Sequence, residues 1–325
     1  MRKIKNQDKG ENKMGKIESK EKEKEIKAGY IAIVGKPNVG KSTLINNLLN
    51  IKASIVSPKP QTTRVNIYGY TIKEIDNKII QLVLIDTPGY HKPVNMLGQN
   101  MIKHIESALT EADVILMLID ATNPLDDEDF LFINLLKEKF LNKNIILGIN
   151  KIDKLENRNL ALTIIEEMNS YNLFKEIVPI SAIKNENIDK LIEVLAKYLP
   201  YNEYLIDPQD SQPFIGNLRF FIAEVIREKI LLFTHQELPY KTAVFVEHLK
   251  ERKNNLLYIA ATIFVEKESQ RSIIIGKSGQ MIKKIGKAAR EELEFILKKK
   301  IYLDLWVKEK ENWTSKLDFI QSIGY

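Results

Sequence analysis

The segment GKPNVGKS, from Gly35 to Ser42, decides the fold of the first half of the chain. It follows the apolar run YIAIV (30–34) and precedes the helical pattern TLINNLLN (43–50). The segment fits the spacing G-x-x-x-x-G-K-[ST] in the strand, loop and helix setting that this motif requires. Its glycines let the backbone close around phosphate, and the amides at the helix start face the negative charge. The expected phosphate ligands are Gly35, Lys36, Pro37, Asn38, Val39, Gly40, Lys41, Ser42 and Thr43.

The sequence around this loop alternates in the manner of a doubly wound α/β domain. Short apolar runs recur at 79–85, 113–119, 144–149 and 176–180, with longer amphipathic stretches between them. Apolar runs without alternation indicate strands buried on both faces, and therefore a mostly parallel sheet covered by helices. We expect this P-loop domain to span residues 28–200.

The base is chosen by a second motif, NKID (150–153), which follows the apolar strand NIILGI. It lies at the carboxyl end of the sheet, where ligands of such folds bind. Asp153 is placed to accept from the N1 and N2 donors of guanine, whereas adenine would leave the carboxylate unmatched. The dipeptide SA (181–182) follows another strand and offers an amide to guanine O6. The predicted ligand is therefore GTP, with contacts from Asn150, Lys151, Asp153, Ser181 and Ala182.

A magnesium site is expected beside the phosphates. DTPG (86–89) ends the strand IIQLVLI, so that Asp86 can hold Mg²⁺ through water and Gly89 can offer its amide to the γ-phosphate. In PQTTR (60–64) a threonine hydroxyl can complete the Mg²⁺ shell, and we favour Thr63 over Thr62. The predicted metal residues are Ser42, Thr63 and Asp86; Thr62, Thr87, Pro88 and Gly89 complete the predicted nucleotide contacts.

No catalytic residue is assigned. The position after DTPG holds Tyr90, where many small GTPases carry a glutamine that orients the attacking water. We expect Tyr90 to pack in a half-buried loop and the neighbouring His91 to be an incidental loop histidine. Slow intrinsic hydrolysis follows from this reading.

A second domain begins after a proline-rich linker at 201–213 and spans residues 214–313. Its patterns run helix, strand, strand, helix, strand, which indicates an α+β sandwich. GKSG (276–279) opens a long basic helix, and a G-x-x-G loop in this setting is typical of a type II KH domain that grips nucleic-acid backbone. A plain turn would also explain the glycines. The predicted RNA contacts are Gly276, Lys277, Ser278, Gly279, Lys283 and Lys284; Trp306 is expected to pack instead.

Composition agrees with a soluble protein that has an anionic partner, and net charge alone does not separate nucleic acid from a membrane surface. The chain of 325 residues is 44% hydrophobic and 28% charged, has a formal net charge of +6, and lacks cysteine, which excludes disulfides and thiolate metal sites. The charged segment 1–27 is expected to be a disordered tail, and 314–325 a short C-terminal tail. No apolar run is long enough to span a bilayer, so we expect a cytoplasmic protein. We also expect it to be a monomer.

The motifs GKPNVGKS, TTR, DTPG, NKID and SA, in this order, resemble those of the translation-factor-related GTPases. PQTTR, DTPGYHKP and the appended domain resemble the Era-like subfamily, bacterial GTPases of small ribosomal subunit assembly, over nearly all of residues 29–313. The resemblance implies binding to small-subunit ribosomal RNA near its 3′ end, action in 30S assembly and peripheral contact with the inner face of the cell membrane. It also implies that Asn38 helps a potassium ion to assist hydrolysis.

Two other functions remain open at this stage. One is an RNA-binding regulatory module in which nucleotide is a ligand and hydrolysis is incidental. The other is a GTPase that drives tRNA modification or peptide translocation; the absence of cysteine weakens the tRNA-modification case.

Overall fold

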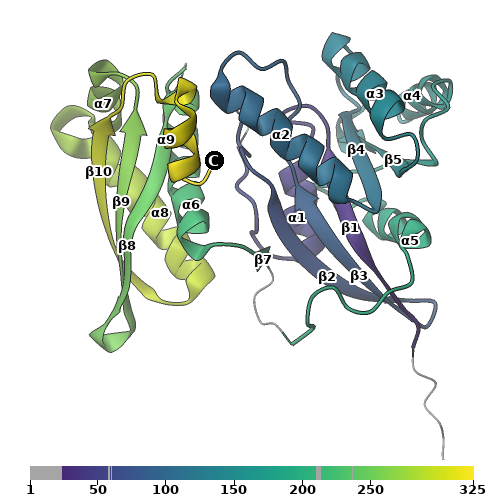
Figure 1. The fold of residues 1–325 in the computed structure, drawn as a ribbon, viewed down its shortest axis with the longest axis horizontal. Helices are drawn as coiled ribbons and strands as arrows, with labels where there is room; N and C mark the ends of the chain where they lie inside the picture. Colours follow the sequence, from purple (N-terminus) through teal and green to yellow (C-terminus); the bar gives the residue numbers. More distant parts are fainter. Residues whose placement is uncertain (1–23, 58, 60, 210–213, 236) are drawn as a thin grey trace, which may run out of the picture.

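The computed structural model describes residues 24–57, 59, 61–209, 214–235 and 237–325. Most of the charged segment expected to form the N-terminal tail lies outside the described residues. Its last two residues, Ile26 and Lys27, belong to the first strand. The described chain forms two bodies that lie side by side (Figure 1).

The first body is built on a seven-stranded sheet in the order β6-β5-β4-β1-β3-β2-β7. Strand β1 pairs in parallel with β3 and β4, and the parallel ladder continues through β5 to β6, whereas β2 runs antiparallel to β3. The mostly parallel, doubly wound sheet is as predicted. The strands are β1 (Ile26–Val34), β2 (Ile67–Ile75), β3 (Lys78–Asp86), β4 (Val114–Asp120), β5 (Asn144–Asn150), β6 (Glu176–Pro179) and β7 (Phe214–Ile215).

Helices cover both faces of this sheet, because its central strands present apolar side chains in both directions. One core joins the sheet to α1 (Lys41–Leu49) and α5 (Ile188–Tyr198). The opposite core joins it to α2 (Met96–Glu111), α3 (Asp127–Lys139) and α4 (Asn159–Asn169). The loops at the carboxyl ends of β1, β3, β4 and β5 carry the predicted nucleotide motifs, so the fold gathers them at one edge.

The linker is held on the first domain. Gln81 accepts hydrogen bonds from the amides of Leu205 and Ile206 and donates to the carbonyl of Ile206. Strand β7 then pairs with the edge strand β2. Residues 214–215, expected to open the second domain, therefore extend the first domain's sheet, because an exposed edge strand can accept a further partner.

The second body is an α+β sandwich whose three-stranded sheet has the order β10-β9-β8. Strand β9 pairs antiparallel with β8 and parallel with β10. One core joins the sheet to the two long helices. The elements are α6 (Leu218–Phe233), β8 (Ala243–Arg252), β9 (Leu256–Val265), α7 (Glu268–Ile275), α8 (Gln280–Leu297) and β10 (Lys300–Glu309).

Helix α7 was not expected, because the sequence pattern assigned no helix before GKSG. The run SIIIG instead ends a short helix that buries Ile274 and leaves Ile273 exposed. Eight residues give too little periodicity for the pattern to be read. The glycine loop therefore joins two helices, in the order α-β-β-α-α-β.

The C-terminal segment is not a tail. Residues 313–325 form the turn η5 (Trp313–Ser315) and the helix α9 (Leu317–Ser322), which lies beside α2 of the first domain (Figure 1). Trp313, Ile320 and Tyr325 are buried in one cluster with Val65 and Met101 of the first domain. Apolar residues spaced along this short segment fill the junction between the domains.

A membrane-crossing helix was sought over the described residues, and none there is both long and apolar enough.

Candidate functional site

The backbone of the phosphate-binding loop has the close approaches that its glycines predict. Gly35 and Gly40 adopt φ values of 141° and 104°, which favour glycine. A Cβ on Gly35 would lie 2.3 Å from the carbonyl oxygen of Leu118, and one on Gly40 would lie 2.2 Å from Nδ2 of Asn150. The loop therefore passes directly against the ends of β4 and β5, where no side chain would fit.

Lys41 begins α1 and points into this loop. Its Nζ donates to the carbonyl oxygens of Gly35 at 3.0 Å and Lys36 at 2.8 Å, and the residue is 6% exposed. Burial lowers the pKa of Lys41 to about 8, although the nearby Asp86 acts in the opposite direction. A cation held in this position is ready to pair with phosphate oxygens.

The neighbouring lysine of the loop is arranged differently. Nζ of Lys36 pairs with Asp126 at 2.7 Å and Asp129 at 2.6 Å, at the start of α3. Its side chain therefore fixes the loop against α3, and Lys36 can contact phosphate through its backbone.

The three predicted metal residues meet at one point. Oδ2 of Asp86 accepts from the hydroxyls of Ser42 at 2.8 Å and Thr63 at 3.2 Å, and the two hydroxyl oxygens are 3.1 Å apart. Thr62 is turned away, because its hydroxyl donates to the carbonyl of Lys59 at 2.6 Å. The geometry thus favours Thr63 over Thr62.

The residues present fit a magnesium ion. Asp86 is fully buried, yet within the described part of the chain its Oδ1 has no hydrogen-bond partner. Burial raises the pKa of this carboxyl, against the opposing effects of Lys41 and the nearby hydroxyls. A hard cation would satisfy the orphaned oxygen, and carboxylate and hydroxyl oxygens are ligands that Mg²⁺ accepts.

The two predicted base-binding motifs are joined by hydrogen bonds. Asn150 donates from Nδ2 to the carbonyl of Val39 at 2.7 Å, and its Oδ1 accepts from the amide of Ala182 at 3.0 Å. The hydroxyl of Ser181 donates to Oδ1 of Asp153 at 2.6 Å. NKID and SA therefore form one rim with the phosphate loop. The amide of Ala182, expected to face guanine O6, donates to Asn150 instead.

Asp120 supports this rim and was not predicted from the sequence. Lys151 has a φ of 67°, and its Nζ pairs with Asp120 at the end of β4. Asp120 also accepts from Thr122 and Asn123. The only signal in the sequence was an aspartate directly after a buried strand, which did not by itself separate this role from a turn.

A cavity of about 340 Å³ lies beside the phosphate loop, lined by Lys36, Pro37, Asn38, Gln61, His91 and Glu128. His91 Nδ1 lies 2.9 Å from the carbonyl of Gly89, so it carries a proton, and His91 Nε2 lies 3.4 Å from Nε2 of Gln61. His91, expected to be incidental, therefore faces this cavity. Tyr90 packs as predicted, with its ring centroid 4.6 Å from that of Phe132.

In the GKSG loop of the second domain Lys277 and Ser278 are exposed, and three of the four residues have a positive φ. Gly276, Ser278 and Gly279 have φ values of 72°, 52° and 74°. A Cβ on Gly276 would lie 2.7 Å from Cβ of Met281, whereas a Cβ on Gly279 would meet nothing within 4 Å. Gly276 thus serves the packing of the loop, and Gly279 borders open space that a backbone phosphate could enter.

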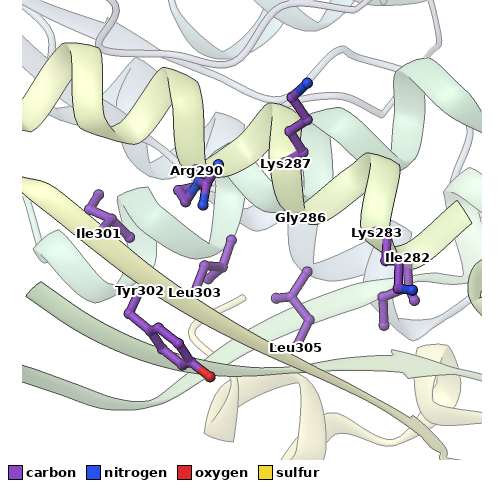
Figure 2. A pocket seen from close by; sticks show the side chains of 9 residues that line it. All are labelled: Ile282, Lys283, Gly286, Lys287, Arg290, Ile301, Tyr302, Leu303 and Leu305. Carbon is purple, nitrogen blue, oxygen red and sulfur yellow. The ribbon is translucent and has the colours of Figure 1, made fainter. Parts of the chain in front are cut away.

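A groove of about 540 Å³ lies between β10 and α8, the helix that follows this loop in the chain (Figure 2). The helix contributes cations and the strand contributes apolar side chains. Lys283, Lys287 and Arg290 recur at intervals of four and three residues, so they share one helical face. The lining residues are Ile282, Lys283, Gly286, Lys287, Arg290, Ile301, Tyr302, Leu303 and Leu305. Of these, only Lys283 was predicted from the sequence.

The structure adds a contact to one predicted RNA residue of this domain and corrects one expectation about packing. Lys284, predicted to contact RNA, lies with Nζ 4.3 Å from the ring centroid of Phe233 on α6, because adjacent helix positions point about 100° apart. Trp306, expected to pack, is 60% exposed, because it lies on the face of the edge strand β10 opposite the helices. Trp313 is fully buried.

Curated relatives match this chain along almost all of their own length. The GTPase Era of Aquifex aeolicus (strain VF5) is 44% identical over 308 residues, covering 92% of this chain and 99% of the relative. The GTPase Era of Clostridioides difficile (strain 630) is 42% identical over 307 residues, with the same shares covered. The chain belongs to the Era family of GTPases.

Family models and solved structures agree with this membership. The model described as 50S ribosome-binding GTPase matches residues 30–151, and the KH domain model matches residues 237–314. A structure of Era in complex with MgGDPNP and nucleotides 1506–1542 of 16S ribosomal RNA is 43% identical, with a TM-score of 0.86, and covers 92% of this chain and 99% of its own. An Aquifex aeolicus Era variant bound to GDP and AlF4⁻ gives a TM-score of 0.85 at 43% identity. The chain is therefore an Era GTPase whose P-loop domain is followed by a KH domain.

Proposed function

We propose that this Era GTPase binds and hydrolyses GTP at the edge formed by its phosphate loop, NKID and SA. The observation that carries the assignment is the meeting of Ser42, Thr63 and Asp86 beside the buried ammonium group of Lys41. A relative of this family was solved with MgGDPNP, which supports the same ligand here. The residues proposed to contact the nucleotide are those predicted from the sequence.

The roles within the site follow from the contacts. Lys41 would pair with the β- and γ-phosphates, and the amides of the loop would bind the remaining oxygens. Ser42, Thr63 and Asp86 would hold Mg²⁺, which when bound neutralises charge between the β- and γ-phosphates. Thr63 lies on a loop whose described residues form neither helix nor strand, so contact of its hydroxyl with Mg²⁺ would depend on how that loop is held.

Hydrolysis by the isolated protein should be slow, and faster in potassium than in sodium. Tyr90 packs on Phe132, and the nearby Arg64 donates to the carbonyls of Tyr240 and Thr242, so neither is placed to act on phosphate. Arginine fingers contribute about 10³ to 10⁵ to the rate in other GTPases, so turnover without a partner should be far below about 1 s⁻¹. Asn38 borders the cavity beside the phosphate loop and is proposed to help hold K⁺.

This prediction is checked by steady-state phosphate release in matched KCl and NaCl buffers, with Asn38→Ala as the comparison variant. Potassium should accelerate wild type, and the Asn38→Ala variant should lose that acceleration. Equal rates of the wild-type protein in the two salts would remove the potassium proposal.

We propose further that the KH domain binds small-subunit ribosomal RNA near its 3′ end, and that the protein acts in assembly of the 30S subunit. Support comes from the exposed GKSG loop, the basic groove beside it, and the relative solved with nucleotides 1506–1542 of 16S ribosomal RNA. Single-stranded RNA suits such a groove, because the loop grips the backbone while apolar walls receive bases.

The groove assignment predicts that two adjacent lysines differ in their effect on RNA binding. Lys283→Ala should weaken affinity for a fragment of the 16S 3′ end, whereas Lys284→Ala should not, because Lys284 covers Phe233 outside the groove. Gly279→Asp should weaken binding more, since it places a carboxylate where phosphate would approach. Affinities are measured at fixed salt, because phosphate contacts depend on ionic strength.

GTP affinity should be unchanged in all three variants, since the groove and the nucleotide site lie in separate domains. Equal RNA affinities of the two lysine variants would contradict the groove as the RNA site. Retention of full affinity by Gly279→Asp would contradict the role of the loop.

We also propose that the protein is a cytoplasmic monomer that makes peripheral contact with the inner face of the cell membrane. The resemblance and the composition support these proposals on location and oligomeric state. Light scattering of the purified protein tests the first part, and co-sedimentation with anionic vesicles tests the second.

A further inference from the structure

The loop that carries Thr63 is gripped by the second domain. Arg227 on α6 is fully buried and donates from its two Nη atoms to the carbonyl oxygens of Gln61, at 3.4 Å, and Thr62. These carbonyls belong to the two residues directly before Thr63. A charged donor that satisfies two consecutive carbonyls fixes the path of the backbone there.

The residue directly after Thr63 is held as well. Arg64 is 1% exposed and donates to the carbonyl oxygens of Thr242 at 2.8 Å and Tyr240 at 3.1 Å. Its guanidinium carbon lies 5.6 Å from the ring centroid of Trp313 and 5.1 Å from that of Tyr325. Thr63 is thus fixed on both sides by contacts to the second domain and the C-terminal segment.

The guanidinium group of Arg227 is itself held by Glu224. Glu224, one helical turn earlier on α6, accepts from Nε of Arg227 at 2.8 Å and also from its Nη2. The hydroxyl of Tyr325 donates to the same carboxylate at 2.8 Å. Glu224 and Tyr325 are 2% and 5% exposed. A hydrogen-bonded series therefore runs from Tyr325 through Glu224 and Arg227 to the backbone beside Thr63.

We propose that Arg227, braced by Glu224 and Tyr325, is a positioning residue that holds the hydroxyl of Thr63 at the magnesium site. This inference rests on the nucleotide function proposed above. The Thr63 hydroxyl lies 3.2 Å from Asp86, on a segment between α1 and β2 whose described residues form neither helix nor strand. Such a segment costs conformational entropy to order, and the contacts from α6 supply the ordering before the metal binds.

A positioning role has a signature that simple packing between domains lacks. A threonine of this loop is expected to complete the Mg²⁺ shell when γ-phosphate is present, and the loop is released when that phosphate is lost. Arg227 should therefore strengthen binding of a magnesium-loaded GTP analogue but not of GDP. If Arg227 only joined the domains, its loss would lower stability without separating the two nucleotides.

The experiment compares Arg227→Lys with wild type in titrations of MgGDPNP and MgGDP. Lysine keeps the charge but has a single nitrogen, so it lacks the planar fork whose three nitrogens reach both carbonyls and Glu224. We expect affinity for MgGDPNP to fall about 10- to 100-fold, the usual effect of losing an outer-shell partner of a metal site. Affinity for MgGDP should stay the same. Hydrogen exchange of the amides at residues 61–65 should also be faster in the nucleotide-free variant.

The matched control is Arg219→Lys, on the same helix. Arg219 donates to the carbonyls of Val246 and Glu247 within the second domain, away from the Thr63 loop. It should change neither nucleotide affinity nor exchange of the loop amides.

A second variant keeps the proposal testable if Arg227→Lys does not fold. Tyr325→Phe removes only the hydroxyl bond to Glu224 and keeps the ring over Arg64. Tyr325→Phe should also lower the affinity for MgGDPNP, by a smaller factor than Arg227→Lys does. In the double variant with Arg227→Lys, the loss of binding free energy for MgGDPNP should be less than the sum of the two single losses, because both residues act through one series of contacts.

An equal loss of affinity for both nucleotides, or no loss for either, in the two variants would overturn the positioning role. A wild-type protein that binds neither nucleotide would instead overturn the proposed nucleotide function, and this inference with it.

Discussion

Lys41→Ala is expected to lower affinity for GTP at least about 30-fold while the protein stays folded. The ammonium group is buried within the phosphate loop, where it contacts the carbonyl oxygens of Gly35 and Lys36. Losing one partner of a buried charge pair costs about 2 to 5 kcal/mol, and each 1.4 kcal/mol is a factor of about ten in affinity. Isothermal titration with MgGTP or MgGDPNP measures the loss.

The variant should stay folded, because burying the charged Lys41 lowers the stability of the nucleotide-free protein. Burial lowers the pKa of Lys41 to about 8 in the folded state, below its ordinary value of 10.5. The unfolded chain therefore binds more protons between these two pH values, and stability rises with pH across that window. At pH 7 the charged, buried lysine destabilises the fold, so the alanine variant should melt no lower than wild type. Lys139→Ala, an exposed lysine paired with Glu106, is the control that should leave GTP affinity unchanged. Unchanged affinity in Lys41→Ala would contradict the phosphate assignment.

The first domain could be predicted from the sequence because its motifs are contiguous and each carries its own geometry. The spacing in GKPNVGKS fixes which residues face phosphate, and its position between a strand and a helix fixes where the loop lies. The same holds for NKID after β5. The choice of Thr63 over Thr62 stays a prediction; the Thr63 hydroxyl contacts Asp86, whereas the Thr62 hydroxyl donates to the carbonyl of Lys59.

What could not be predicted depends on residues far apart in sequence. Arg64 lies within a recognised motif, yet its partners, Tyr240 and Tyr325, are more than 170 positions away. No local pattern announces such contacts. Residues 314–325 were expected to form a tail for the same reason, since these 12 residues have no core of their own. They become ordered only because two domains offer a shared apolar surface.

In the second domain the prediction was also limited because the sequence does not show which way each side chain points. Lys283 and Lys284 are equivalent by composition, but only Lys283 lies in the groove. Trp306 alternates correctly for a strand, yet alternation does not reveal which face of an edge strand is covered. Resolving either question required the packing of α6 and α8 against the sheet.

Asp153→Asn is expected to change the preferred nucleotide from GTP to xanthosine triphosphate. Oδ1 of Asp153 accepts from the hydroxyl of Ser181 at 2.6 Å, which fixes the carboxylate with its other oxygen available to the base. Guanine offers donors at N1 and N2 to a carboxylate. Xanthine replaces the N2 amino group with a carbonyl oxygen, which an asparagine amide can donate to, while the asparagine oxygen still accepts from Ser181.

The size of the change follows from unmatched polar groups. A buried donor or acceptor without a partner costs about 1 to 3 kcal/mol, and the substitution both removes a match for guanine and creates one for xanthine. The ratio of the two affinities should therefore shift by at least about 30-fold. Competition between the two triphosphates, each with Mg²⁺, measures this ratio directly. Asp189→Asn, an exposed carboxylate on α5, is the matched control and should keep the preference for GTP. An Asp153→Asn variant that still prefers GTP would show that another group selects the base. The hydrogen bond from Ser181 to Asp153 would then serve only the structure of the loop, and the free oxygen of Asp153 would not face the ligand.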